Sequence, residues 1–326
     1  MPNINLDDAY ILDETGAQVD KVTGLFTKDE GTTSGEKAFA QLNIGTAGSN
    51  RNLLDNPWFT VNQRGLTSGT HTTMPADRWK ATYGSGSVNW TRESDGCITF
   101  GPTNAASHGD LYQQIPDEIY NALAGTDKTV TLSVMMQDGT IYSGTSYLPT
   151  TSTRAYIDVL NVGGTSSRLV VYVQASTKQL FVQAFYGNLT VKAVKLEKGS
   201  VSTLANDAPP DYAEELMKCN FYDIMLKTSA AYGYLGYGIA DSTTSATILI
   251  PLPNNMRDAT PTITTSGTIA VKGGTSGTHT MTGITFKLRV TGGVLVTVTT
   301  TGLTTGEFCL LQLNNASSYI NLSADL

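Results

Sequence analysis

Alternation of apolar and polar residues is the dominant pattern along most of the chain. In the segment Ile284–Thr291 apolar side chains occupy every second position, and a Gly-Gly pair then separates it from a second alternating run that begins at Val294. Two alternating runs joined by two glycines predict a β-hairpin, because both turn positions of such a hairpin favour φ > 0. Strand-sized runs also occupy Leu169–Gln174, Leu180–Tyr186 and Thr190–Glu197. The pattern predicts an all-β protein with two β-sandwich or jelly-roll domains in tandem.

Two further runs differ in how far we expect them to be buried. Thr129–Met135 alternates hydroxyl with aliphatic side chains, which predicts a half-buried strand. Phe308–Leu313 is almost continuously apolar, which predicts a terminal strand buried on both faces.

Helical periodicity is confined to short segments. Ile115–Leu123 predicts a helix of a turn or two. After Pro209 and Pro210, Asp211 is a candidate N-cap for a short helix with Tyr212, Leu216 and Cys219 on one face. In the acidic N-terminal part a helix of two to three turns is expected around Phe39 and Leu42. Because so short a helix is unstable alone in water, we expect Phe39, Leu42 and Ile44 to pack against a partner in attachment or oligomerisation.

These patterns divide the chain into four parts. We expect an N-terminal attachment or oligomerisation segment, a jelly-roll domain, a helical connector and a C-terminal β-sandwich domain. Their predicted boundaries are residues 1–50, 51–203, 204–228 and 229–326.

Charge and composition exclude several classes of function. The formal net charge of the 326 residues is −7, which disfavours sequence-independent binding of nucleic acid or of an anionic membrane surface. No apolar run approaches the roughly 20 residues that cross a bilayer, so membrane insertion is not expected. The N-terminus lacks the basic and apolar regions of a signal peptide. The three cysteines lie far apart, so we expect buried small hydrophobes rather than disulfides or a zinc site.

Residues that could carry catalysis are sparse. The only histidines are His71, His108 and His279, which we interpret as surface-loop residues, and no phosphate-binding, dinucleotide-binding or metalloprotease motif occurs. No cofactor or metal is therefore expected. A pair of carboxylates for glycoside hydrolysis remains open, since their separation depends on the fold. The candidates are Asp77, Glu93, Asp95, Asp110, Asp117 and Glu118.

Aromatic residues offer a second kind of site. An aromatic ring combines an apolar face with, in Tyr and Trp, a polar tip, and so stacks well on flat ligands such as sugars. We assign Trp58 and Trp79 to the core of the first sandwich. Tyr83, Tyr142 and Tyr147 are the candidate glycan contacts, the last two because they lie in or beside a long polar loop, and loops carry binding more often than strands do.

Several segments, taken in order, resemble bacteriophage fibre and appendage proteins. GEKAFAQLNIGTAG (residues 35–48) is similar to an element near the N-termini of many tail fibres. NLLDNPWFTVNQRG (52–65) and PADRWK (75–80) resemble the opening of a jelly-roll module common in such proteins. VKAVKLEKGSVST (191–203) and PPDYAEELMKCNFYD (209–223) resemble its close and connector. LPNNMRDATPTIT (252–264) resembles the start of their C-terminal domain.

The resemblance implies a structural virion protein, made in the cytoplasm of a bacterial host. It would be a non-enzymatic homotrimeric fibre or appendage that attaches to phage tail or capsid proteins through residues 1–50 and binds host surface glycans. Many weak contacts on one particle would supply avidity. A capsid-attached head fibre or decoration protein is the first alternative. A glycan-cleaving virion enzyme and a free-standing carbohydrate-binding module are the others.

Overall fold

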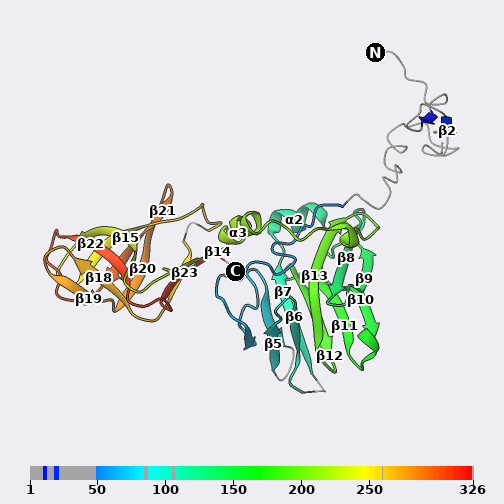
Figure 1. The fold of residues 1–326 in the computed structure, drawn as a ribbon, viewed down its shortest axis with the longest axis horizontal. Helices are drawn as coiled ribbons and strands as arrows, with labels where there is room; N and C mark the ends of the chain where they lie inside the picture. The colour runs from blue at the N-terminus through cyan, green and yellow to red at the C-terminus, as the bar shows by residue number, and fades with distance from the viewer. Residues whose placement is uncertain are drawn as a thin grey trace, which may run out of the picture. The chain divides into compact units, whose positions relative to one another are not determined.

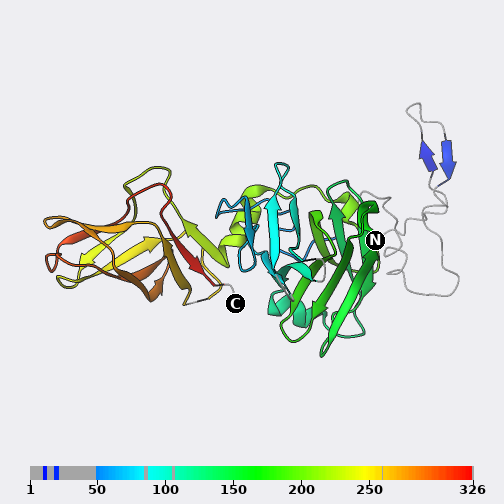
Figure 2. The same cartoon turned by 90° about the horizontal axis from the view of Figure 1, so that it is seen from below.

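A computed structural model describes residues 10–12, 18–21, 49–83, 87–104, 107–258 and 260–324. The named strands pair in antiparallel fashion, which confirms the all-β prediction (Figures 1 and 2). Strands β1 (Tyr10–Leu12) and β2 (Gln18–Lys21) form a small ladder of their own. The helix predicted around Phe39, and with it Phe39, Leu42 and Ile44, lies outside the described residues.

Two sheets enclose the first hydrophobic core. The five-stranded sheet has the order β10 (Thr153–Leu160), β11 (Arg168–Gln174), β12 (Gln179–Phe185), β7 (His108–Gln114) and β4 (Lys80–Tyr83). The six-stranded sheet has the order β3 (Ser68–Thr70), β5 (Val88–Arg92), β6 (Ile98–Pro102), β13 (Leu189–Lys198), β8 (Val130–Met136) and β9 (Ile141–Ser146).

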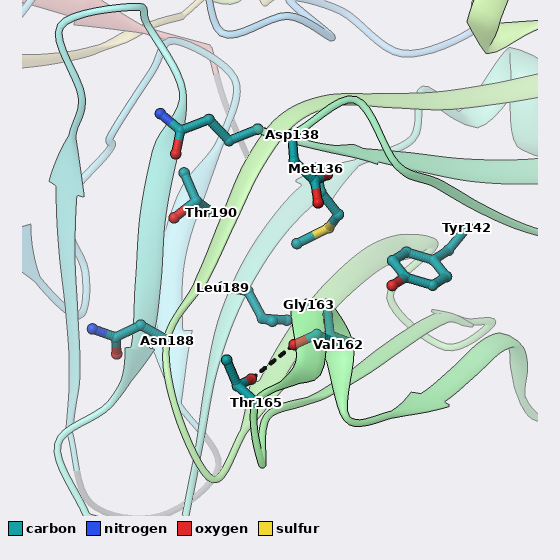
Figure 3. A pocket seen from close by; sticks show the side chains of 10 residues that line it. Met136, Asp138, Tyr142, Val162, Gly163, Thr165, Asn188, Leu189 and Thr190 are labelled. Atoms are coloured by element: carbon teal, nitrogen blue, oxygen red, sulfur yellow. Dashed lines mark hydrogen bonds between the residues drawn. The ribbon is translucent and has the colours of Figure 1, made fainter.

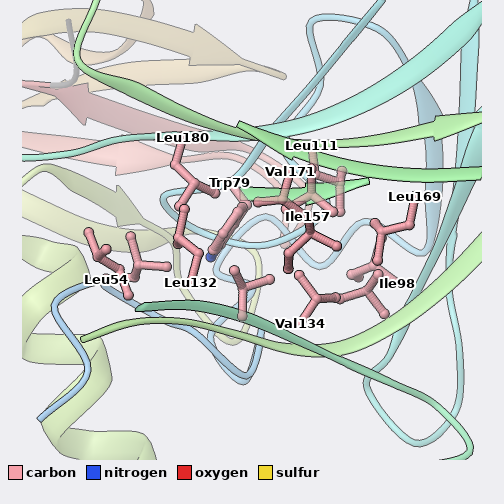
Figure 4. Packing of buried hydrophobic residues seen from close by; sticks show 14 of the residues in the cluster. Leu54, Trp79, Ile98, Leu111, Leu132, Val134, Ile157, Leu169, Val171 and Leu180 are labelled. Atoms are coloured by element: carbon pink, nitrogen blue, oxygen red, sulfur yellow. The ribbon is translucent and has the colours of Figure 1, made fainter. Parts of the chain in front are cut away.

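Alternating side chains of both sheets fill the space between them. Leu169, Val171 and Leu180 of the five-stranded sheet meet Leu132 and Val134 of the six-stranded sheet in one buried cluster (Figure 4). Since side chains alternate across a strand, the residues between these inward positions must point away from the core. This register therefore determines which side chains form the outer faces.

The turns of the predicted jelly-roll opening are held by one buried network. Asn56 is completely buried with φ of 48°, and its side-chain amide donates to the carbonyl oxygens of Val61 at 2.9 Å and Asp77 at 2.8 Å. The indole of Trp79, also fully buried as predicted, donates to the Asn56 carbonyl at 3.0 Å. Trp58, in contrast, is only half-buried, because its ring lies at a surface pocket with Lys192 5.9 Å away. Trp58 is therefore not part of the first core, and it packs instead against a small separate cluster of Met135, Ala193 and Leu204.

Strand β8 corrects a second expectation, because all seven of its residues are buried rather than every second one. The chain after β13 folds back over its polar face. Thr131 Oγ1 donates to the Gly199 carbonyl at 2.8 Å, and Ser133 Oγ donates to Ser202 Oγ at 2.7 Å. Hydrogen bonding compensates the burial of both hydroxyls.

The short helices lie where periodicity predicts them. They are α2 (Asp117–Leu123) and α3 (Tyr212–Asn220), with single 3₁₀ turns η3 (Val162–Gly164) and η4 (Leu204–Asn206). The Asp211 side chain caps α3 by accepting from two backbone amides, as expected. The Glu215 carboxylate of α3 accepts a hydrogen bond from the backbone N–H of Asn56 at 2.7 Å, and Arg64 forms an ion pair with Asp223 at 2.8 Å. The predicted helical connector is therefore bonded to the first sandwich. No described helix has the length and apolarity needed to cross a membrane.

The C-terminal part contains a second core. One sheet has the order β14 (Asp223–Leu226), β23 (Tyr319–Ser323) and β17 (Thr262–Ser266). The other has the order β19 (Gly277–Thr280), β18 (Ile269–Gly273), β22 (Phe308–Leu313), β15 (Gly233–Ala240), β16 (Ser245–Pro251), β21 (Gly293–Thr299) and β20 (Gly283–Val290). Their buried side chains form a cluster separate from the first.

The predicted hairpin is confirmed as β20 and β21, but its turn is not Gly-Gly. Val290 pairs with Gly293, so the turn residues are Thr291 and Gly292, and of these Gly292 has a positive φ of 74°. Strand β22 differs from its prediction in two ways. It is followed by β23, so it is not terminal, and Phe308 at its start is 53% exposed. A continuous apolar run in the sequence therefore does not reveal that the start of this strand has an exposed side chain.

Candidate functional site

The outer face of the five-stranded sheet gathers aromatic and polar side chains. We call it the aromatic face and define it by eight residues. They are Tyr172, Phe181, Tyr112, Gln183, Asp110, Arg168, Phe185 and His108. The first core uses the alternate positions of the same strands, β7, β11 and β12, so these eight project away from it. The three strands lie side by side (Figure 1).

Three rings form a continuous row across the sheet. Tyr172 pairs directly with Phe181, and Phe181 with Tyr112, in the registers of neighbouring strands. The Tyr172 and Phe181 ring centroids are 4.8 Å apart with an interplanar angle of 4°, and those of Phe181 and Tyr112 are 5.4 Å apart at 25°. The two tyrosines are half-buried and flank the buried phenylalanine. The result is a rigid apolar strip with a phenol at each end.

A row of hydrogen-bonding groups runs beside the rings. Gln183 pairs with Asp110 in the ladder, and its amide nitrogen donates to Asp110 Oδ2 at 3.2 Å. His108 Nδ1 lies 2.7 Å from Asp110 Oδ1. Asp110 is only 3% exposed, so a carboxylate and an amide are fixed close to the aromatic strip. Groups held in this way lose little conformational entropy when they bind a polar ligand.

The third row adds a cation. Phe185 packs on His108 with ring centroids 4.9 Å apart, and the Arg168 guanidinium lies 5.4 Å from the Phe185 ring centroid. Arg168 donates to both oxygens of Asp158 at 2.7 and 2.6 Å, so its planar head is oriented. Hydrogen bonding from Arg168 lowers the pKa of Asp158.

Burial changes the titration of two groups on this face. It raises the pKa of Asp110 above its ordinary value, although hydrogen bonds from His108 and Gln183 act in the opposite direction. Burial, with a smaller contribution from the Asp110 charge, raises the pKa of Tyr172 to about 12. The Tyr172 hydroxyl is therefore a neutral hydrogen-bonding group across the physiological range.

The three tyrosines predicted as glycan contacts lie elsewhere. Tyr142 is half-buried in β9 of the opposite sheet, and Tyr147 follows the same strand. The Arg154 guanidinium covers the Tyr147 ring at 3.9 Å and also donates to its hydroxyl. Tyr83 ends β4 with its backbone opposite Gly109, and its side chain lies outside the described residues. The structure does not bring Tyr142 or Tyr147 onto the aromatic face, and their glycan contact stays a prediction.

Tyr142 does line a pocket, shown in Figure 3. Met136, Leu189 and Val162 form its apolar wall, and the Thr165 hydroxyl donates to the Val162 carbonyl at 2.8 Å beside it. The pocket volume is about 190 Å³. Pockets for small organic ligands usually measure about 300–1,000 Å³, so this pocket is small for a sugar chain.

The candidate carboxylates are dispersed. Asp77 is buried beside Arg64, Glu93 and Asp95 lie between β5 and β6, and Asp117 and Glu118 belong to α2. Of these six candidates only Asp110 belongs to the aromatic face. Among the described residues no group of three or more potential metal ligands occurs. Two of the histidines correct the sequence interpretation, since His108 and His279 lie in strands rather than loops.

The aromatic face could have been found only through strand register. Tyr172 lies between Val171 and Val173 in an apolar run, so alternation places it outward but does not reveal which other side chains lie beside it. The partners come from strands far apart in sequence. No protein-family model matches the chain, and no curated protein matches it either.

Proposed function

We propose that the chain is a structural virion protein of a bacteriophage, a homotrimeric fibre or appendage whose aromatic face binds host surface glycans without catalysis. The observation that carries the proposal is the row Tyr172–Phe181–Tyr112 beside Asp110 and Gln183. A sugar ring presents an apolar face to an aromatic ring and hydroxyls to its sides. The half-buried tyrosine rings supply the stacking surface and phenols that hydrogen-bond to hydroxyls, while the buried pair Asp110 and Gln183 fixes the neighbouring strands beside them.

The shape of the site also favours glycans over small ligands. The row runs across three neighbouring strands of one sheet, and its two tyrosines are partly exposed at the ends while Phe181 between them is buried. Two tyrosines that lie two strand spacings apart, about 10 Å, suit a chain longer than one sugar ring better than a single small ligand. Weak binding at one platform becomes strong on a particle that carries many copies.

The spacing of carboxylates supports binding without cleavage. The second carboxylate in the Asp110 register row is Asp158, which lies three strands away on β10. Strands are spaced about 4.8 Å apart, so the two lie roughly 14 Å apart along the sheet, compared with about 5–9.5 Å in glycosidases. Asp158 is moreover bonded to Arg168.

Purified chain should therefore be retained on an array of bacterial lipopolysaccharides, capsular polysaccharides and teichoic acids. Tyr112→Ala should lose at least about tenfold in affinity for the retained glycan, whereas Tyr112→Phe, which keeps the ring, should lose much less. Equal retention of wild type and Tyr112→Ala would refute the assignment of the site. Shortening of the retained polysaccharide by the wild type would favour the enzyme alternative.

The location on the virion needs a separate experiment. Antibody labelling of intact particles should mark the tail if the chain is a tail fibre and the capsid if it is a head fibre or decoration protein. Particles that carry no label, from a lysate in which the chain is present, would contradict the virion proposal and favour a free-standing carbohydrate-binding module.

A further inference from the structure

The seven-stranded sheet presents an outer face of different chemistry. One register row carries leucine or tyrosine side chains on five neighbouring strands and ends at Lys272 on a sixth, β18. It contains Leu310, Tyr237, Leu249, Leu295 and Leu288. The next row begins with the directly paired Phe308 and Ile239. We call these seven residues the apolar face.

This face is not covered by another described element. The second core uses the alternate residues of the same strands, including Ile248, Val296 and Leu311. Tyr237 is 49% exposed, Ile239 57% and Phe308 53%. Contiguous exposed apolar side chains on this scale mark interaction sites rather than ordinary surface.

A small set of polar groups lies at the edge of the apolar face. Thr247 donates its hydroxyl to Asp241 at 2.7 Å and accepts from Lys287 Nζ at 2.8 Å, so these three groups are bonded to one another. The row itself contains four leucines, whose branched side chains offer no flat stacking surface. Side chains of this kind are complementary to another apolar protein surface.

We infer that a second copy of this chain covers the apolar face. The whole outer surface of the seven-stranded sheet, on which the apolar face occupies five strands, measures about 700 Å², since its strands lie about 4.8 Å apart and are roughly six residues long at about 3.3 Å each. That is close to the roughly 800 Å² per partner that a stable interface buries.

Charge favours a copy as well. The whole chain carries −7, so two copies repel in general. Beside the apolar face, however, one cation and one anion lie close together, Lys287 and Asp241, both bonded to Thr247. In a contact between two copies, Lys287 of each can therefore lie near Asp241 of the other, which offsets part of the general repulsion.

The test is the mass of the full-length chain in solution, measured by light scattering over a range of micromolar concentrations. We expect an assembly at a multiple of 34.7 kDa. Ile239→Glu should raise the dissociation constant on the order of a hundredfold, since it places an unpaired charge in the interface. Val201→Glu is the matched control, because Val201 is an equally accessible aliphatic residue, 68% exposed, outside this sheet. Phe308→Lys provides a second variant on the neighbouring strand.

A wild type that remains at 34.7 kDa at every concentration would overturn the inference. So would equal dissociation of Ile239→Glu and Val201→Glu. The inference rests on the proposed function only in that a multivalent appendage needs several chains. The two are separable, because a monomeric Ile239→Glu variant should still bind a single glycan through the aromatic face with unchanged affinity.

Discussion

The outer faces of the five-stranded and seven-stranded sheets share a geometry and differ in chemistry. Each carries a row of side chains that oppose one another directly across neighbouring strands. On the aromatic face the row is three rings with fixed polar groups beside it. On the apolar face the row is four leucines and one tyrosine, and the polar groups nearby are bonded to each other.

The comparison shows that exposed apolar area alone does not indicate the kind of partner. Flat rings beside a buried carboxylate provide both stacking and hydrogen bonding, as a hydroxylated ligand requires. Branched aliphatic side chains provide mainly burial, which a protein surface matches. We therefore assign the first face to a glycan and the second to another copy of the chain.

The largest expected effect tests whether the two faces are energetically separate. Trp79→Ala should reduce the free energy of unfolding of the first sandwich by about 3–5 kcal/mol, because it removes a fully buried indole. Since the second core is a separate cluster, self-association through the apolar face should survive. Denaturant titration and light scattering measure the two effects. Trp58→Ala, at a half-buried position, is the control and should cost much less.

Loss of self-association in Trp79→Ala, together with glycan binding, would show that the faces are coupled. The two faces would then depend on one another and could not be assigned separate partners.

A chemical swap sharpens the comparison further. Phe181→Leu gives the aromatic row an aliphatic centre like that of the apolar face while keeping most of the buried volume. We expect glycan affinity to fall about tenfold, since stacking contributes roughly 0.5–1.5 kcal/mol beyond area burial. Leu249→Phe on the other sheet is the converse swap. It should create little glycan binding, because the row would then contain two rings and three leucines rather than three stacked rings. Calorimetric titration measures both, and unchanged affinity in Phe181→Leu would contradict the stacking role.

Much of the fold could be predicted from sequence, and little of the site. Alternation marked β11, β12, β20 and β21, because each strand covers a core on one side only. It misjudged β8 and β22, since burial of Thr131 depends on a later segment and exposure of Phe308 on the lack of a covering element. These are properties of tertiary structure, which a local pattern does not contain.

The site was missed for a related reason. Loop position favoured Tyr142 and Tyr147, whereas the geometry that distinguishes Tyr172 is its register with Phe181 and Tyr112. That register depends on pairing between strands distant in the chain. Leu249 illustrates the same point on the apolar face, since it lies in a continuous apolar run that conceals which residues face outward.

The smallest expected effect concerns Asp110. Burial raises its pKa in the folded protein above the value of 3.8 of an ordinary aspartate, so the folded state binds this proton more tightly than the unfolded state does. The associated stability is complete below pH 3.8 and is lost as the pH rises through the folded pKa. Relative to wild type, Asp110→Asn should therefore become more stable as the pH rises through this window. Denaturant titration at several pH values measures the difference, and a difference that does not change with pH would contradict the expected titration.

The most direct test of the central claim uses one residue type on both faces. Calorimetric titration with a glycan retained on the array should be carried out on wild type, Tyr172→Ala and Tyr237→Ala. The proposed roles predict that Tyr172→Ala binds at least about tenfold more weakly, because it loses a ring of the stacked row. Tyr237→Ala should bind the glycan at the aromatic face as tightly as wild type does. Equal loss in both variants, or loss only in Tyr237→Ala, would contradict the assignment of the two faces.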